Sequence, residues 1–191
     1  VGIRNRATLA GNLCSAVPSN DAGPVLLAAG ANLQVAGPRG ERTLALADWF
    51  LGPRRTALGE GELVTGIAIP LPGPHGGCYL KLGRYRGEDL AQASVAVLAL
   101  PGDHYRVAFG AVAPATVRAA ALEGYLEGRP LDEAVLAGAA DLVPAVISPI
   151  TDIRASAAYR THMCRVMLLR ALRAAAGRLA GEGPPYGTRL L

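Results

Sequence analysis

The first part of the chain alternates short apolar runs with turns, which predicts one helix followed by strands. The apolar run Pro24–Ala29 has proline near its start and Gly30 just past its end, as is typical of a helix. We expect a strand over 32–35, a turn over 38–41 and a returning strand over 42–44. These residues should therefore form a helix and a β-hairpin.

A loop rich in proline and glycine over 70–77 is the clearest candidate for a domain boundary. Before it, a short helical turn over 47–50 is expected to bury Trp49, the only tryptophan of the chain. The segment 61–69 ends with apolar side chains at every second position, which predicts a strand that leads into the loop.

Beyond the loop, strand patterns are followed by helix patterns, which predicts a small α+β domain with a three-stranded antiparallel sheet. The run Ser94–Leu100 is nearly all apolar, so it should be the central strand. The expected strands are 78–82, 91–100 and 105–112, and the expected helices are 117–127, 131–142 and 156–180. The tail after Gly181 contains Pro184-Pro185 and is expected to be loose.

Composition indicates a folded chain with a sizeable core. Of the 191 residues, 51% are hydrophobic and 18% are charged, which argues against intrinsic disorder. No apolar run reaches the about 18 residues that a membrane-spanning helix needs. The three cysteines are widely spaced, which argues against a disulfide framework or a metal cluster and favours a reducing cytoplasm. Cys164 lies among apolar residues and is expected in the core.

The net charge of +4 raises the possibility of a basic nucleic-acid-binding module. The basic residues are dispersed, however, and the few aromatic side chains show no stacking pattern beside them, which disfavours this function. The three histidines have no serine or cysteine partner in a known motif, so we expect neither a catalytic nucleophile nor a metal site in this chain.

Two local features are candidates for chemistry. The segment Thr8–Asn12 has the small and polar residues of a turn that brings backbone N–H groups close to an anion, and Asp21 follows it. By itself this pattern also fits an ordinary structural turn. Lys81 is the only lysine among 19 cationic side chains, which suggests a position that needs a compact ammonium group. The alternative is that this lysine has been retained by chance on an exposed strand.

The opening Ile3–Asn12, with Asp21 nine positions after Asn12, resembles the second flavin-binding segment of the FAD subunit of molybdenum hydroxylases, the xanthine dehydrogenase and carbon monoxide dehydrogenase group. The segment Lys81–Ala91 resembles a second signature of that family, in which a lysine and an arginine precede an aspartate. The runs Ala113–Arg118 and Asp152–Arg160 match it too, and we interpret both as scaffold or subunit contacts.

The resemblance implies a flavin site. It places the segment beginning at Thr8 against the FAD pyrophosphate and ribityl chain. It also places an aliphatic pair, Leu63 and Val64, on the flavin ring, and Lys81 at the edge of that ring. Alone, the aliphatic pair would be interpreted as ordinary core. Ala10 stands where the family more often has glycine, which restricts the backbone there. The implied cofactor-binding residues are Thr8, Leu9, Ala10, Gly11, Asn12, Ser15, Asp21, Leu63, Val64 and Lys81.

The resemblance also implies an organisation. Residues 1–70 would be the C-terminal half of a PCMH-type FAD-binding domain, 77–180 the C-terminal α+β domain and 181–191 a tail. The first FAD loop of the family lies in a preceding segment, which is expected to be fused or separate. The chain would relay electrons from [2Fe-2S] clusters of a small subunit through FAD to an external acceptor. The molybdenum cofactor would lie in a large subunit, within a dimer of heterotrimers. A non-flavin structural or assembly subunit that keeps the fold is the alternative.

Overall fold

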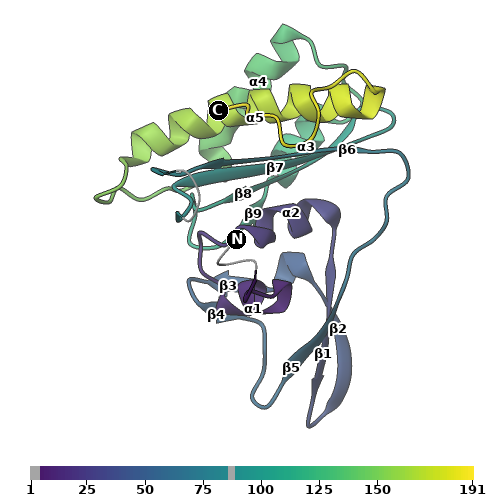
Figure 1. Ribbon diagram of the computed structural model, residues 1–191, viewed down its shortest axis with the longest axis vertical. Helices are drawn as coiled ribbons and strands as arrows, with labels where there is room; N and C mark the ends of the chain where they lie inside the picture. The colour runs from purple at the N-terminus through teal and green to yellow at the C-terminus, as the bar shows by residue number, and fades with distance from the viewer. Residues whose placement is uncertain (1–4, 86–88) are drawn as a thin grey trace.

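The computed structural model describes residues 5–85 and 89–191. The chain forms a smaller N-terminal part, which ends with the strand Leu63–Ala68, and a larger C-terminal part, which begins with the strand Gly76–Leu82 (Figure 1). The helices are α1 (Leu9–Ser15), α2 (Ala22–Ala29), the short 3-10 helix η1 (Leu46–Asp48), α3 (Ala120–Leu126), α4 (Glu133–Val146) and α5 (Ala157–Ala180). The strands are β1 (Asn32–Gly37), β2 (Gly40–Ala45), β3 (Phe50–Gly52), β4 (Arg55–Thr56), β5 (Leu63–Ala68), β6 (Gly76–Leu82), β7 (Ala93–Leu100), β8 (His104–Gly110) and β9 (Val117–Arg118).

The N-terminal part contains the predicted helix and hairpin. Strands β1 and β2 pair antiparallel around the turn, and β5 pairs with the other edge of β1 to give the order β2-β1-β5. Trp49 is fully buried, as expected, and its Nε1–H donates to the carbonyl of Leu13, 3.0 Å away. This bond ties α1 to the core. The small ribbon of β3 and β4 was not predicted, because its strands are too short to show a hydrophobic period.

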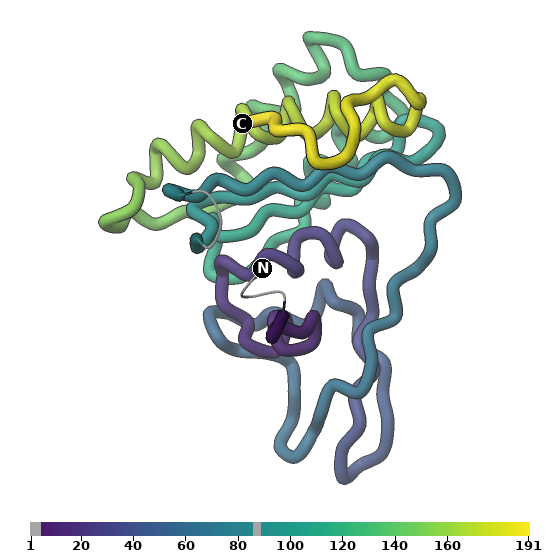
Figure 2. The backbone as a smooth tube through the Cα atoms, in the orientation of Figure 1, coloured from purple at the N-terminus to yellow at the C-terminus, as the bar shows by residue number. Residues whose placement is uncertain are grey.

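The C-terminal part is a sheet in the order β6-β7-β8-β9, with every neighbouring pair antiparallel. Its nearly all-apolar strand β7 is an inner strand, as the sequence predicts. Helix α5 packs along β6 and β7 on one face, and α2 packs on the opposite face against β7 and β8 (Figures 1 and 2). Ala96 and Ala108 belong to the same buried cluster as α2, so the core of the N-terminal part extends onto this sheet.

Strand β9 and the start of α3 differ from the expectation. Val117 and Arg118 pair with Phe109 and Ala108, so they add a short fourth strand before α3 begins at Ala120. The reason is a side chain: Glu123 accepts hydrogen bonds from the guanidinium of Arg118 and from the backbone N–H of the neighbouring strand β8.

The tail was expected to be loose, but it is held against the body of the protein. Helix α5 ends at Gly181, whose φ of 79° suits glycine. Arg178 then donates to the carbonyls of Pro184 and Gly77, at 2.8 and 2.7 Å, and its guanidinium lies 4.5 Å from the centre of the Tyr186 ring. One arginine therefore fastens the tail to both α5 and β6.

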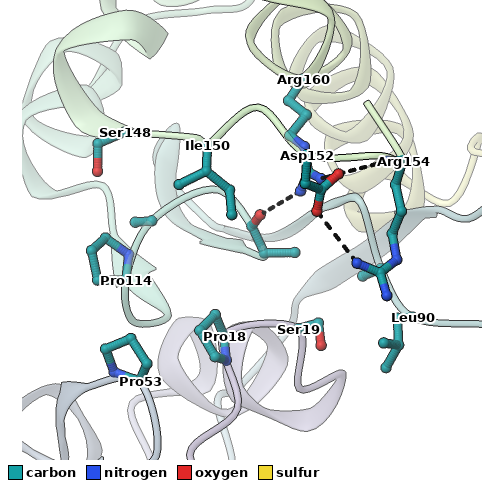
Figure 3. A pocket seen from close by; sticks show the side chains of 13 residues that line it. Pro18, Ser19, Pro53, Leu90, Pro114, Ser148, Ile150, Asp152, Arg154 and Arg160 are labelled. Carbon is teal, nitrogen blue, oxygen red and sulfur yellow. Dashed lines mark hydrogen bonds and ion pairs between the residues drawn. The ribbon is translucent and has the colours of Figure 1, made fainter. Parts of the chain in front are cut away.

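A buried arginine fastens the start of α5 to the sheet (Figure 3). Arg160 is 4% exposed and donates to the carbonyls of Gln92 and Ala111, at 3.0 and 3.4 Å, and to Oδ1 of Asp152 at 2.7 Å. Ser156 caps the helix by accepting from a backbone N–H. These contacts support the scaffold interpretation of the run Asp152–Arg160.

We predict that Gly76→Ala destabilises the protein, whereas Gly77→Ala does not. A Cβ at Gly76 would collide with the backbone of Ala175 and Leu179 on α5, while a Cβ at Gly77 would meet open space. Forcing a methyl group between a strand and a helix costs about 1–3 kcal/mol. Urea unfolding of the two variants provides the measurement. Equal midpoints for both variants would show that the close approach of α5 to β6 is not required.

We also predict that Asp152→Asn costs stability at neutral pH and that this cost fades in acid. The N–H groups of Arg154 and Ala155, together with Arg160, lower the pKa of Asp152 to about 2. Because the folded-state pKa lies below the ordinary value, the carboxylate stabilises the fold above about pH 4, and this contribution is lost as the pH falls toward 2. The difference in free energy of unfolding between parent and variant should narrow below pH 4. A difference independent of pH would contradict this role.

Candidate functional site

The segment Thr8–Asn12 is the first turn of helix α1, and not a free turn as the sequence suggested. Thr8 is the N-cap, and its Oγ1 accepts from the Gly11 N–H at 2.9 Å. A Cβ on Gly11 would lie 2.9 Å from that same hydroxyl oxygen, so glycine lets the cap close. The preceding Ile3 and Arg4 of the matched segment lie outside the described residues. The pattern of small and polar residues therefore encodes a capped helix start.

Asn12 and Ser15 make contacts inside this region. Oδ1 of Asn12 accepts from the Ala22 N–H at 3.1 Å, which joins α1 to the first residue of α2. The Ser15 hydroxyl donates to the Asn12 carbonyl at 2.8 Å. Both side chains therefore help to set the position of α1 beside the start of α2.

Asp21 and Lys81 meet, although 60 positions separate them in the sequence. Nζ of Lys81 donates to Oδ2 of Asp21 at 2.7 Å, and the two side chains are 25% and 50% exposed. Asp21 precedes α2, and Lys81 lies on β6, on the sheet that α2 covers. The packing of α2 on this sheet thus creates an ion pair that is open to solvent.

Tyr79 is the member of this group that the sequence did not single out. Its hydroxyl donates to Oδ1 of Asp21 at 2.9 Å, so Asp21 receives one donor on each oxygen. Burial raises the pKa of Tyr79, and the Asp21 carboxylate raises this pKa further. Tyr79 is thus a hydrogen-bond donor. The sequence contained one signal for Tyr79, which stands two positions before Lys81 on the same strand. Residues two apart on a strand share a face.

Leu63 and Val64 lie at the start of β5, opposite Ala36 and Val35 of β1. Leu63 is 70% exposed, and Val64 packs against the N-terminal core. Strand β5, which carries this pair, contacts α1. Among the described residues no hydrogen bond or ion pair links the pair to Lys81.

Asp89 organises the loop that follows β6. It accepts hydrogen bonds from the backbone N–H groups of Arg84, Tyr85 and Leu90. The first of these is the main cause that lowers the pKa of Asp89. This carboxylate therefore shapes the segment that follows Lys81. Arg86, which also belongs to the Lys81–Ala91 segment, lies outside the described residues.

Other parts of the described chain are less suggestive. A pocket of about 290 Å³ lies between Pro18, Pro114, Ile150 and the Asp152–Arg160 pair (Figure 3), and none of the predicted site residues lines it. Residues 5–85 and 89–191 contain no group of three or more histidine, cysteine, aspartate or glutamate side chains arranged to hold a metal ion. Within the same residues, no helix has the length and hydropathy needed to cross a bilayer.

Family models match both parts of the chain. Residues 1–72 match the FAD binding domain in molybdopterin dehydrogenase, and residues 78–175 match the CO dehydrogenase flavoprotein C-terminal domain. The solved carbon monoxide dehydrogenase from Hydrogenophaga pseudoflava superposes with a TM-score of 0.88 at 36% identity, over 93% of this chain and 63% of that one. Quinoline 2-oxidoreductase from Pseudomonas putida 86 superposes with a TM-score of 0.84 at 27% identity, over 95% of this chain and 64% of that one.

Curated relatives agree with this assignment. The carbon monoxide dehydrogenase medium chain of Afipia carboxidovorans is 36% identical over 92% of this chain, and the glyceraldehyde dehydrogenase medium chain of Sulfolobus acidocaldarius is 32% identical over 90% of it. The chain spans 62% of the length of each of these two relatives. The chain therefore belongs to the family of medium, FAD-binding subunits of the molybdenum hydroxylases.

Proposed function

We propose that this chain holds FAD in a molybdenum hydroxylase, with the start of α1 and the cluster of Asp21, Tyr79 and Lys81 forming one side of the site. The ion pair between Asp21 and Lys81 carries this proposal, because it joins the two segments that resemble the family's flavin-binding signatures. We also propose the division into 1–70, 77–180 and a tail over 181–191, which the two family matches support.

The described residues fit such a cofactor. A series of hydrogen bonds runs from Thr8 and Gly11 through Asn12 to the start of α2, where Asp21 meets Lys81. Exposed polar groups and the partly exposed ammonium group of Lys81 thus lie along the same stretch of structure. The site would consist of Thr8, Leu9, Ala10, Gly11, Asn12, Ser15, Asp21, Leu63, Val64 and Lys81, to which we add Tyr79.

The role of this chain is to bind and tune. FAD supplies chemistry that takes electrons singly and delivers them in pairs. Lys81 places a positive charge where negative charge builds up on reduction. Tyr79 and Asp21 hold the ammonium group in place, since each makes a hydrogen bond of 2.9 Å or less within the cluster. No residue of the chain is assigned to oxidation of the substrate.

We propose the electron relay and its partners on the same basis. Electrons would pass from [2Fe-2S] clusters of a small subunit to FAD and then to an external acceptor. The molybdenum cofactor would reside in a large subunit, and two heterotrimers would associate. The medium-chain names of the relatives support such an assembly. The three cysteines are free in the structure, which supports the proposal of a reducing cytoplasm.

The rival is a structural or assembly subunit that keeps the fold without FAD. The two hypotheses differ in the flavin content of the purified native complex. Because [2Fe-2S] clusters also absorb visible light and bleach on reduction, the flavin is released by denaturation and identified by its fluorescence. One flavin per copy of this chain would exclude the rival, and absence of flavin with full occupancy of this chain would favour it. The open ion pair of Lys81 favours the flavin function, because a purely structural pair has no need of a lysine that differs from every other cation in the chain.

We predict that the 191-residue chain binds FAD weakly by itself. It spans 62% of its curated relatives, and we propose that a segment corresponding to their remaining length supplies the first FAD loop, fused or separate. Anaerobic titration with FAD, followed by flavin fluorescence, provides the measurement. Tight, stoichiometric binding would show that the described residues are sufficient.

We predict that Lys81→Met lowers the flavin reduction potential in the assembled complex, because the variant loses a cation that stabilises the reduced form. The expected shift is on the order of 30 mV, equivalent to about 1.4 kcal/mol for a two-electron couple. Lys81→Arg keeps the charge and should retain most of the parent potential. Spectroelectrochemical titration measures all three proteins. An unchanged potential in Lys81→Met with full flavin content would remove this role.

A further inference from the structure

A second pocket, of about 790 Å³, has Lys81 in its lining. It is bounded by β6, by the loop over 83–85, by α5 and by the C-terminal tail, which runs back along α5 beside the sheet (Figure 2). The volume falls within the range of about 300–1,000 Å³ that is usual for sites of small organic ligands. Because the tail is fastened by Arg178, this wall of the pocket is part of the folded protein.

Positive charge gathers in this pocket. Lys81, Arg84, Arg170 and Arg189 line it, whereas no aspartate or glutamate is among its described lining residues. Lys81 has Asp21 as its partner, but the three arginines form no salt bridge within the described residues. Five other described arginines form salt bridges: on the same helix, for instance, Arg173 lies 2.8 Å from Glu133. Four cationic side chains thus line one concave site.

The contacts of these arginines leave donors available. Arg170 donates through one nitrogen to the Leu190 carbonyl at 2.6 Å, and Arg189 donates through Nε to the main-chain oxygen of Leu191 at 2.5 Å. The Arg84 guanidinium lies 5.3 Å from the centre of the Tyr85 ring. A guanidinium has five N–H donors in a planar fork that suits phosphate, so each of these side chains retains binding capacity.

The rest of the lining is apolar or aromatic. Leu82, Met163 and Leu190 contribute hydrocarbon surface, and Tyr85 is 70% exposed. A ligand that matches both features carries a flat ring and one or more phosphate groups. A nucleotide has this combination, whereas an inorganic anion would leave the apolar surface unused.

We propose that this pocket binds a nucleotide bearing a phosphate or pyrophosphate group. The ring lies against Tyr85 and the apolar surface, and the phosphate groups are held by Arg84, Arg170 and Arg189. The site is distinct from the proposed cradle at the start of α1 and adjoins the proposed flavin cluster, with which it shares Tyr79 and Lys81. The proposal stands whether or not the chain holds FAD.

The test uses ADP as the probe and the native complex, with its flavin absorbance recorded before and after titration. Calorimetry at low ionic strength is expected to show saturable binding of ADP that weakens with added salt. Adenosine, which lacks phosphate, should bind at least tenfold more weakly. Absence of saturable ADP binding, or equal affinities for ADP and adenosine, would overturn the proposal.

Variants locate the binding. Arg84→Gln and Arg170→Gln should each weaken ADP binding about 5- to 10-fold, since each removes a charge-assisted contact to phosphate. Arg84 makes no bond to the tail in the described structure, so its variant separates ligand binding from tail packing. Arg173→Gln is the matched control, because Arg173 is also on α5 but pairs with Glu133 outside the pocket. Equal affinities in all variants would contradict the assignment.

Two further outcomes would also overturn it. Loss of flavin from Arg84→Gln or Arg170→Gln would make the pocket a part of the flavin site. If a polyglutamate peptide bound in a manner dependent on Arg170 while ADP did not bind, the surface would be one for an acidic protein segment. Failure of the flavin function would be visible separately, as absence of flavin from the parent complex.

Discussion

The close packing of α2 on the second sheet is the constraint on which the rest of the structure depends. The sheet presents small residues where the helix lies: Ala96 and Ala108 are buried beneath it, and a Cβ on Gly110 would collide with Pro24 of the helix. Larger side chains would push α2 away. Because the helix sits so close, the carboxylate of Asp21 at its start reaches Lys81 on β6.

The opposite face of the sheet is held by a different balance of forces. Helix α5 buries an apolar face that includes Cys164, Met167 and Leu168, and burial raises the pKa of the Cys164 thiol to about 12. Two arginines of the same helix then fix its ends: Arg160 bonds to the sheet and to Asp152, and Arg178 bonds to β6 and the tail. Apolar burial supplies the attraction, and the directional bonds of the arginines fix how the helix lies on the sheet.

Elements with a clear hydrophobic period could be predicted from the sequence, and elements made by side-chain contacts could not. Helix α5 begins at Ala157 and ends at Ala180, within a residue of the expected limits. Strand β9 was missed because two residues have no period, and it depends on Glu123. The tail was interpreted as loose because proline and glycine favour loops. Its composition gives no indication of the hydrogen bonds that Arg178 of α5 donates to it.

The sequence by itself determined the order of the elements with a clear hydrophobic period, the family, and the identity of the two charged residues of the candidate site, because periodicity and motif residues are local properties. Only the tertiary structure decided that Asp21 and Lys81 form a pair, that Tyr79 joins them, and that Thr8 caps a helix. Such contacts depend on which faces meet after packing, and a separation of 60 positions carries no local signal. The cationic pocket beside Lys81 has the same origin, since its walls come from three separate segments that meet only in the folded chain.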